Sequence, residues 1–139
     1  MAWLGKLFKR QPMLELQDPV FGSLNYAQGI WTFLPKEPTD GVLIGVYAPE
    51  AGPSGQQRSL FSRVRAELPQ FESLARDYIA SCAEPSVPVD QLSTYSVQIG
   101  DDDATQREEF VLELSDEDAY VVHRVSFKAG RPVNCGFDD

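Results

Sequence analysis

The sequence predicts an α+β fold, with a mainly antiparallel sheet of about six strands and a proline-kinked helix, or a helix pair, packed across one face. Three observations predict it. Segments of strand character fill residues 13–49, an apolar stripe at helical spacing fills residues 60–82, and strand character returns over residues 93–128. The order strands–helices–strands, with short connections and no βαβ alternation, favours this class.

The first part of the chain predicts about three or four short antiparallel strands. MLELQ alternates apolar and polar residues, and VFGSLNYA and IWTFL follow it. Asp18-Pro19 and Gln28-Gly29 supply the turns between these runs. GVLIGVYAP at 41–49 is the most strand-like run, since its β-branched residues lie between a glycine and a proline.

A helical signal begins with Ser54 and Gln57, which have the spacing of a capping box. Pro69 falls inside the apolar stripe that follows, where it removes a hydrogen bond and clashes with the carbonyl of Arg65, so we expect a kink or a restart there. The stripe keeps its phase across the proline, which predicts that both halves pack on the same sheet face. Its members are Leu60, Val64, Leu68, Phe71, Ala75, Tyr78 and Cys82.

Strands are predicted again at about 93–100, 109–115 and 119–128. The polar runs DDDATQRE and SDEDA are read as the turns between them. In the last strand, alternation places His123 with Val125 and Phe127 on an apolar face.

Charge separates a short basic start from an acidic body. The 139 residues carry a formal charge of −9 with a pI near 4.5, yet Lys6, Lys9 and Arg10 fall where there is no acid. Without these three, nine basic residues face 21 acidic ones, which leaves the remaining chain at −12. We therefore divide the chain into a basic amphipathic segment, 1–12, and a single α+β domain, 13–139. Such a body argues against nucleic-acid binding and favours either plain solubility or a basic protein partner.

The cysteines and the first residues predict a soluble cytoplasmic protein. Cys82 and Cys135 belong to no CxxC or Cys/His cluster, so reduced thiols are the simpler reading. MAWLGKLFKRQP lacks the long apolar region and the cleavage site of a signal peptide, and no segment has the length of a membrane span. No phosphate-binding loop or dinucleotide fingerprint is present, and we expect no cofactor.

His123 is the only histidine, so imidazole chemistry of any kind has to use it. Its place on an apolar strand face favours a buried, hydrogen-bonded side chain over a catalytic one. The sequence pairs no nucleophile with it, and we expect no catalytic residue. A small hydrolase or ligand-binding domain with a pocket between helix and sheet is the alternative that depends on this side chain.

The acidic loops are the second candidate site. Read as a calcium loop from Asp101, the chain has Gln106 where glycine is needed and Leu112 where glutamate is needed, so we expect no metal site. A solvated hairpin loop is the plain interpretation. If the hairpins stack, the acidic residues form one negative end of the sheet that binds a basic protein: Asp101, Asp102, Asp103, Glu108, Glu109, Asp116, Glu117 and Asp118.

The N-terminal segment has an apolar face at helical spacing, formed by Trp3, Leu4, Leu7 and Phe8. Such a face fits an anionic membrane surface or a groove on a partner. It is short for stable membrane attachment, and packing on its own domain is an equal alternative. A peripheral membrane adaptor attached through residues 1–10 is therefore a further alternative.

The pattern Asp18-Pro19-x-Phe21-Gly22-x-Leu24, followed by Trp31, a strand and a helix, resembles small uncharacterised bacterial domains of unknown function. Some members of these families occur near polymorphic toxin systems, where immunity proteins are found. The resemblance spans about residues 14–82, implies a bacterial α+β domain and transfers no catalytic residue. A proline at a strand start, a glycine bulge and a tryptophan at a core edge explain the same residues structurally.

Taken together, these features predict a non-enzymatic protein-binding domain, of the immunity or antitoxin kind, directed against a basic partner. The acidic body, the lack of a coherent catalytic set and the resemblance support this prediction.

Overall fold

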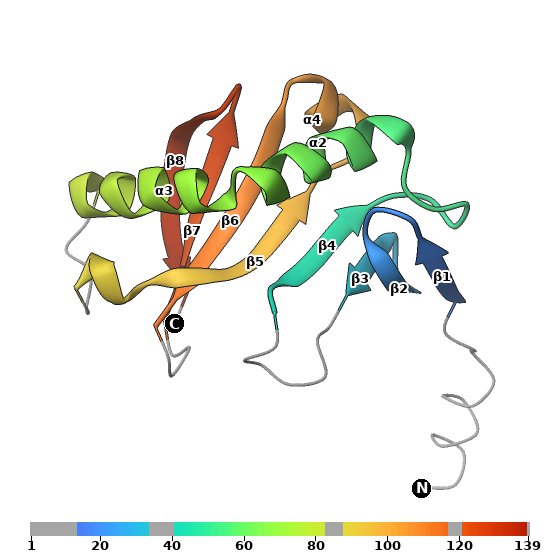
Figure 1. The fold of residues 1–139 in the computed structure, drawn as a ribbon, viewed down its shortest axis with the longest axis horizontal. Helices are drawn as coiled ribbons and strands as arrows, with labels where there is room; N and C mark the ends of the chain where they lie inside the picture. Colours follow the sequence, from blue (N-terminus) through green and yellow to red (C-terminus); the bar gives the residue numbers. More distant parts are fainter. Residues whose placement is uncertain (1–13, 34–40, 83–87, 117–120, 139) are drawn as a thin grey trace, which may run out of the picture.

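The computed structural model describes residues 14–33, 41–82, 88–116 and 121–138, and the N-terminal segment lies outside these ranges. Eight strands form one sheet in the order in which they occur along the chain (Figure 1). The α+β class is confirmed, but the sheet has eight strands where about six were expected. The strands are β1 (Leu14–Asp18), β2 (Gly22–Ala27), β3 (Ile30–Phe33), β4 (Leu43–Tyr47), β5 (Ser93–Ile99), β6 (Glu109–Ser115), β7 (Val122–Lys128) and β8 (Arg131–Asp138).

The sheet is mixed. β4 and β5 pair in parallel, and the other neighbouring strands pair antiparallel. The helical segment between β4 and β5 explains this, because it returns the chain to the end of the sheet where β4 began. β4 and β5 therefore end at the same edge, which is where the candidate site lies.

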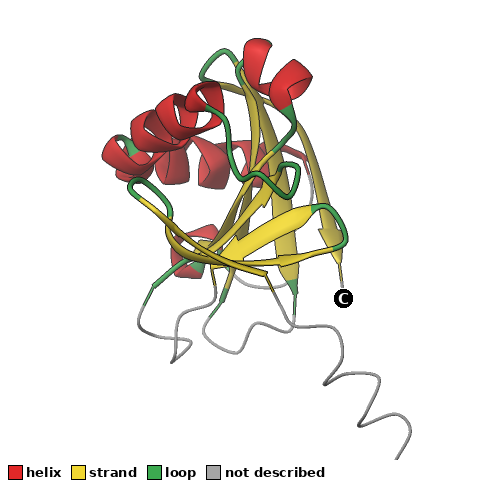
Figure 2. Ribbon diagram, turned by 90° about the vertical axis from the view of Figure 1, so that its right-hand side faces the viewer, coloured by secondary structure: helices red, strands yellow, loops and turns green. Residues whose placement is uncertain are grey.

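Two α-helices, α2 (Gly55–Ala66) and α3 (Leu68–Cys82), cover one face of the sheet (Figure 2). The capping box is confirmed, since Ser54 accepts a hydrogen bond from the Gln57 backbone and the Gln57 side chain accepts one from the Ser54 backbone. The sequence predicted either one kinked helix or a helix pair, and the structure has the pair. Pro69 lies in the first turn of α3, where its missing N–H has no intrahelical partner to lose.

Two short helices lie on either side of β5, so the order of elements is more complex than strands–helices–strands. A 3₁₀ helix, η1 (Val89–Gln91), precedes β5, and α4 (Asp102–Gln106) follows it. The prediction of a simple turn in DDDATQRE was wrong. Asp101 caps α4 by accepting a hydrogen bond from the Ala104 backbone N–H, which converts the turn into a helical one.

The core lies between the helices and the sheet. Trp31 from β3 is 2% exposed and donates its indole N–H to the Pro49 carbonyl. Phe110 and Phe127 stack across β6 and β7, and the Phe71 ring from α3 meets both edge-on. Along the helices the buried stripe follows the expected spacing up to Ala75 and then continues through Ile79 rather than Tyr78. Among the described residues, no helix has the length and apolarity needed to cross a membrane.

Candidate acidic pocket and sheet groove

The candidate site lies where the parallel strands β4 and β5 end, beside the first turn of α2. A pocket of about 290 Å³ opens there. We call it the acidic pocket because three consecutive aspartates of the α4 segment line it. Its lining consists of Tyr47, Pro49, Gly52, Ser54, Gln57, Asp101, Asp102 and Asp103.

Gln57 fixes the floor of the acidic pocket. Its side chain is 2% exposed and donates through Nε2 to the Tyr47 carbonyl at 2.7 Å and to the Gly100 carbonyl at 2.8 Å. Its Oε1 accepts from the Ser54 backbone N–H at 2.9 Å. One amide therefore joins the end of β4, the end of β5 and the start of α2, and it gives hydrogen-bond partners to three part-buried backbone groups.

The carboxylates of the acidic pocket face solvent. Asp101, Asp102 and Asp103 are all exposed, and Asp102 accepts a hydrogen bond of 2.6 Å from the Ser54 hydroxyl. Tyr47 stands next to them with half of its surface exposed, at 51%. Within the described ranges, no group of three or more His, Cys, Asp or Glu side chains is arranged to hold a metal ion. The pocket therefore offers an aromatic face beside an accumulation of negative charge.

A second concavity, the sheet groove, continues from Tyr47 over the sheet face opposite α2 and α3. It measures about 350 Å³ and shares Tyr47 with the acidic pocket. Gln98, Val111, Ser126 and Asn134 form one row across β5, β6, β7 and β8, because these positions are paired in register. Val133, which is 53% exposed, adds an apolar side chain at the edge. The groove thus combines amide and hydroxyl groups with apolar side chains.

The remaining acidic residues that the structure describes do not all lie at one end of the sheet. Glu108 lies at the same edge as α4 but pairs with Arg63 from α2 at 2.8 Å. Glu109 pairs with Arg107, whose hydrogen bond lowers the pKa of the Glu109 carboxyl. Asp116 follows the far end of β6, roughly 20 Å away along the strand. Glu117 and Asp118 lie outside the described residues.

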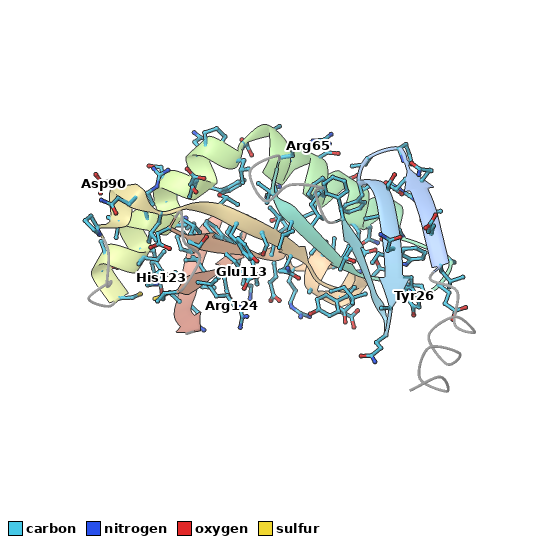
Figure 3. The ribbon with its side chains drawn as sticks, turned by 90° about the horizontal axis from the view of Figure 1, so that it is seen from below. Tyr26, Arg65, Asp90, Glu113, His123 and Arg124 are labelled. Carbon is cyan, nitrogen blue, oxygen red and sulfur yellow. The ribbon has the colours of Figure 1, made fainter. Side chains whose placement is uncertain are left out.

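His123 lies away from both concavities. Its side chain is 4% exposed on the face that the helices cover, and burial lowers the pKa of its imidazole. Arg124, the next residue on β7, points to the opposite face, where it pairs with Glu113 of β6 (Figure 3). The alternation predicted for this strand is observed.

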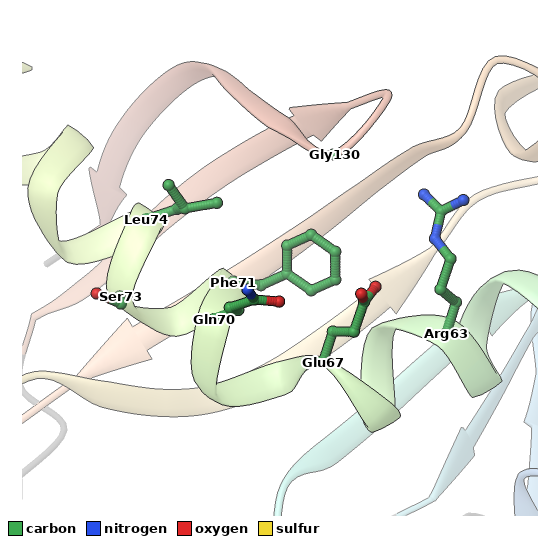
Figure 4. Close-up of a pocket in the computed structure, with 7 residues that line it drawn as sticks. All are labelled: Arg63, Glu67, Gln70, Phe71, Ser73, Leu74 and Gly130. Atoms are coloured by element: carbon green, nitrogen blue, oxygen red, sulfur yellow. The ribbon is translucent and has the colours of Figure 1, made fainter.

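A helix-side pocket of about 580 Å³ lies between the α2–α3 junction and the β7–β8 turn (Figure 4). The alternative of a small hydrolase or ligand-binding domain required a pocket of this kind, between helix and sheet. Its lining holds no histidine or cysteine, and His123 is not part of it. The lining residues are Arg63, Glu67, Gln70, Phe71, Ser73, Leu74 and Gly130.

Burial of the His123 imidazole should make the stability of the protein depend on pH. The folded state holds the pKa of His123 below its ordinary value near 6.5, whereas the unfolded chain takes up a proton at about that pH. The free energy of unfolding should therefore fall as the pH drops below about 6.5. Urea unfolding of the native chain and of the His123→Gln variant between pH 7 and pH 5 measures this. Since the chain has one histidine, an equal loss in both proteins would contradict the assignment.

The apolar face predicted for Trp3, Leu4, Leu7 and Phe8 falls outside the described residues.

No protein-family model matches the chain, and no curated protein or solved structure was found to be similar to it. The resemblance noted above stays a prediction.

Proposed function

We propose that this protein is a non-enzymatic binding domain that recognises a basic segment of another protein at the acidic pocket. The observation that carries the proposal is the exposed Tyr47 ring beside three exposed aspartates at one edge of the sheet. Carboxylates pair with the guanidinium of arginine and the ammonium of lysine, and an aromatic face attracts the same cations. A basic side chain would meet both in this pocket.

The overall charge supports the same kind of partner. A net charge of −9 attracts cationic surfaces at long range and speeds their encounter, and this attraction weakens as salt screens it. Electrostatic complementarity of this kind sets association rate and specificity more than it sets final affinity. Contacts beyond the charged pocket are therefore needed for a stable complex.

The sheet groove supplies such contacts. Gln98, Ser126 and Asn134 present amide and hydroxyl groups that suit the backbone of an extended chain, and Val111 and Val133 suit apolar side chains. Because Tyr47 belongs to both concavities, a basic residue in the acidic pocket leaves the neighbouring residues of the same segment over the groove. The preferred ligand is a segment in which basic and apolar residues alternate.

The resemblance to bacterial domains found near toxin systems supports an immunity or antitoxin-like role for this binding. An immunity or antitoxin-like factor acts by occupying a toxin and needs no catalytic set of its own. An acidic pocket would suit a toxin whose active surface is basic, for example one that acts on a polyanion.

Neutralising the acidic pocket tests the proposal. The triple variant Asp101→Asn, Asp102→Asn, Asp103→Asn keeps side chains that can cap α4 but removes the charge. A fluorescent peptide of alternating arginine and valine should bind it about tenfold more weakly than it binds the native chain at low salt, as measured by fluorescence anisotropy. Tyr47→Ala should weaken the same peptide by several-fold.

A second triple variant separates the pocket from net charge. Glu15, Asp77 and Asp90 are exposed and lie outside the acidic pocket, so changing them to Gln, Asn and Asn alters the total charge by the same amount. This control should bind the peptide nearly as well as the native chain. Equal weakening by the two triple variants, or no binding of the basic peptide by the native chain, would show that the acidic pocket is not the binding site.

A further inference from the structure

The only two cysteines of the chain come together in the fold, although 53 positions separate them in the sequence. Cys82 is the last residue of α3, and Cys135 lies on β8, where α3 packs. Cys135 pairs in register with the buried Val125, so its side chain faces the helix-covered side of the sheet. The Cys82 thiol lies close enough there to raise the pKa of Cys135.

The two sulfurs differ in accessibility. Cys82 is exposed and Cys135 is partly buried against the core. Tyr78, one helical turn before Cys82, lies near both thiols. Burial, together with the neighbouring Cys82 thiol, raises the pKa of Cys135 to about 11. An oxidant in solution would therefore reach Cys82 first, while Cys135 stays protonated at neutral pH.

We propose that Cys82 and Cys135 form a reversible intramolecular disulfide by exchange with a small-molecule disulfide such as oxidised glutathione. The Cys82 thiolate attacks one glutathione sulfur, the glutathione S–S bond breaks, and one glutathione leaves as its thiolate. Cys135 then loses its proton, its sulfur attacks Cys82 Sγ, and the second glutathione leaves. Two protein thiols and one glutathione disulfide become one protein disulfide and two glutathione thiols.

The disulfide would tie the C-terminal end of α3 to the edge strand β8. The closed loop contains β5, β6 and β7, so the link restricts the unfolded chain strongly. Since α3 packs on β8 and Cys135 faces the helix-covered side, the bond joins two elements that already lie together. The oxidised protein is therefore more resistant to unfolding than the reduced one, and β8 is held in place when the surroundings become oxidising.

Equilibration of the full chain with reduced and oxidised glutathione tests this inference. After alkylation of the remaining thiols, mass spectrometry should show a monomer that has lost two hydrogens, and proteolysis should give one cross-linked Cys82–Cys135 peptide. The equilibrium constant for disulfide formation should be on the order of tenfold or more higher in the folded protein than in urea, because only the fold holds the thiols together.

Single variants identify the role of each sulfur. Cys135→Ser should stop at the mixed disulfide between Cys82 and glutathione, whereas Cys82→Ser should react more slowly. Oxidation should raise the unfolding temperature of the native chain and leave that of the double variant Cys82→Ser, Cys135→Ser unchanged. Mixed disulfides on both cysteines, disulfide-linked dimers, or equal equilibrium constants in buffer and in urea would each overturn the proposal.

Discussion

Replacing Gln57 with Leu is expected to lower the free energy of unfolding by about 3 kcal/mol, although the two side chains are similar in size. The substitution removes a hydrogen-bond partner from three part-buried backbone groups at once. The Tyr47 carbonyl loses its Gln57 donor, and the Ser54 N–H loses its acceptor. The Gly100 carbonyl is left with the longer hydrogen bond from the Thr105 hydroxyl, at 3.3 Å. Each group keeps the cost of its desolvation without the hydrogen bond that compensates for it. Urea unfolding followed by circular dichroism measures the loss.

The neighbouring glutamine provides the control. Gln56 occupies the same turn of α2 but is exposed, so Gln56→Leu should change stability by less than about 0.5 kcal/mol. Amide hydrogen exchange should also show faster opening at the ends of β4 and β5 in the Gln57 variant, because those ends lose the bridge between them. A loss of similar size in both variants would mean that the hydrogen bonds of the Gln57 amide contribute little to stability.

Local sequence spacing predicts one function of Gln57 and misses the other. The spacing of Ser54 and Gln57 correctly predicted the capping box, since capping involves residues within one turn. The second function of Gln57 joins it to carbonyls ten and 43 positions away. Such contacts depend on where α2 lies on the sheet, which no local spacing encodes.

The strands that were predicted have either alternation or an apolar run bounded by turn residues, and the one that was missed has neither. RPVNCGFD forms β8 although it contains a proline and a glycine, both unfavourable in strands. Its position at the sheet edge, with a register irregularity where Val133 is left out of the pairing, accommodates Pro132. Pairing with β7 therefore overrides a weak local preference.

The parallel pairing of β4 with β5 could not be predicted from the alternation of apolar and polar residues. Alternation determines which face of the sheet a side chain lies on, but not the direction of the strand. The candidate site follows from that pairing. Tyr47 and the aspartates come from separate elements that meet only because both strands end at the same edge. The sequence drew attention to Asp101, Asp102 and Asp103 through charge, and it gave no signal for Tyr47 or for the meeting of Cys82 with Cys135.

The Asp18 carboxylate in the Asp18-Pro19 turn should contribute strongly to stability. The Asp18 carboxylate is buried and accepts hydrogen bonds of 2.9 Å from the Val20 and Phe21 backbone N–H groups. Arg58 of α2 donates to it at 2.7 Å, which joins the first hairpin to the helix layer. Asp18→Ala should lower the free energy of unfolding by about 3 kcal/mol, because two N–H groups and one cation lose their acceptor together. Asp18→Asn keeps an acceptor for the turn and should cost less.

The same contacts set the response to acid. Burial by itself raises the pKa of Asp18, but the two backbone donors and Arg58 outweigh it, and the pKa is lower in the folded protein than in the unfolded chain. The stabilisation is therefore complete above the unfolded value near 4 and is lost as the pH falls through the folded value. Asp18→Asn should unfold with a shallower dependence on pH below about 4 than the native chain shows. Asp90→Asn, which removes an exposed carboxylate, should keep the native slope. If Asp18→Asn also kept that slope, the ion pair with Arg58 would not be what stabilises the hairpin against the helix.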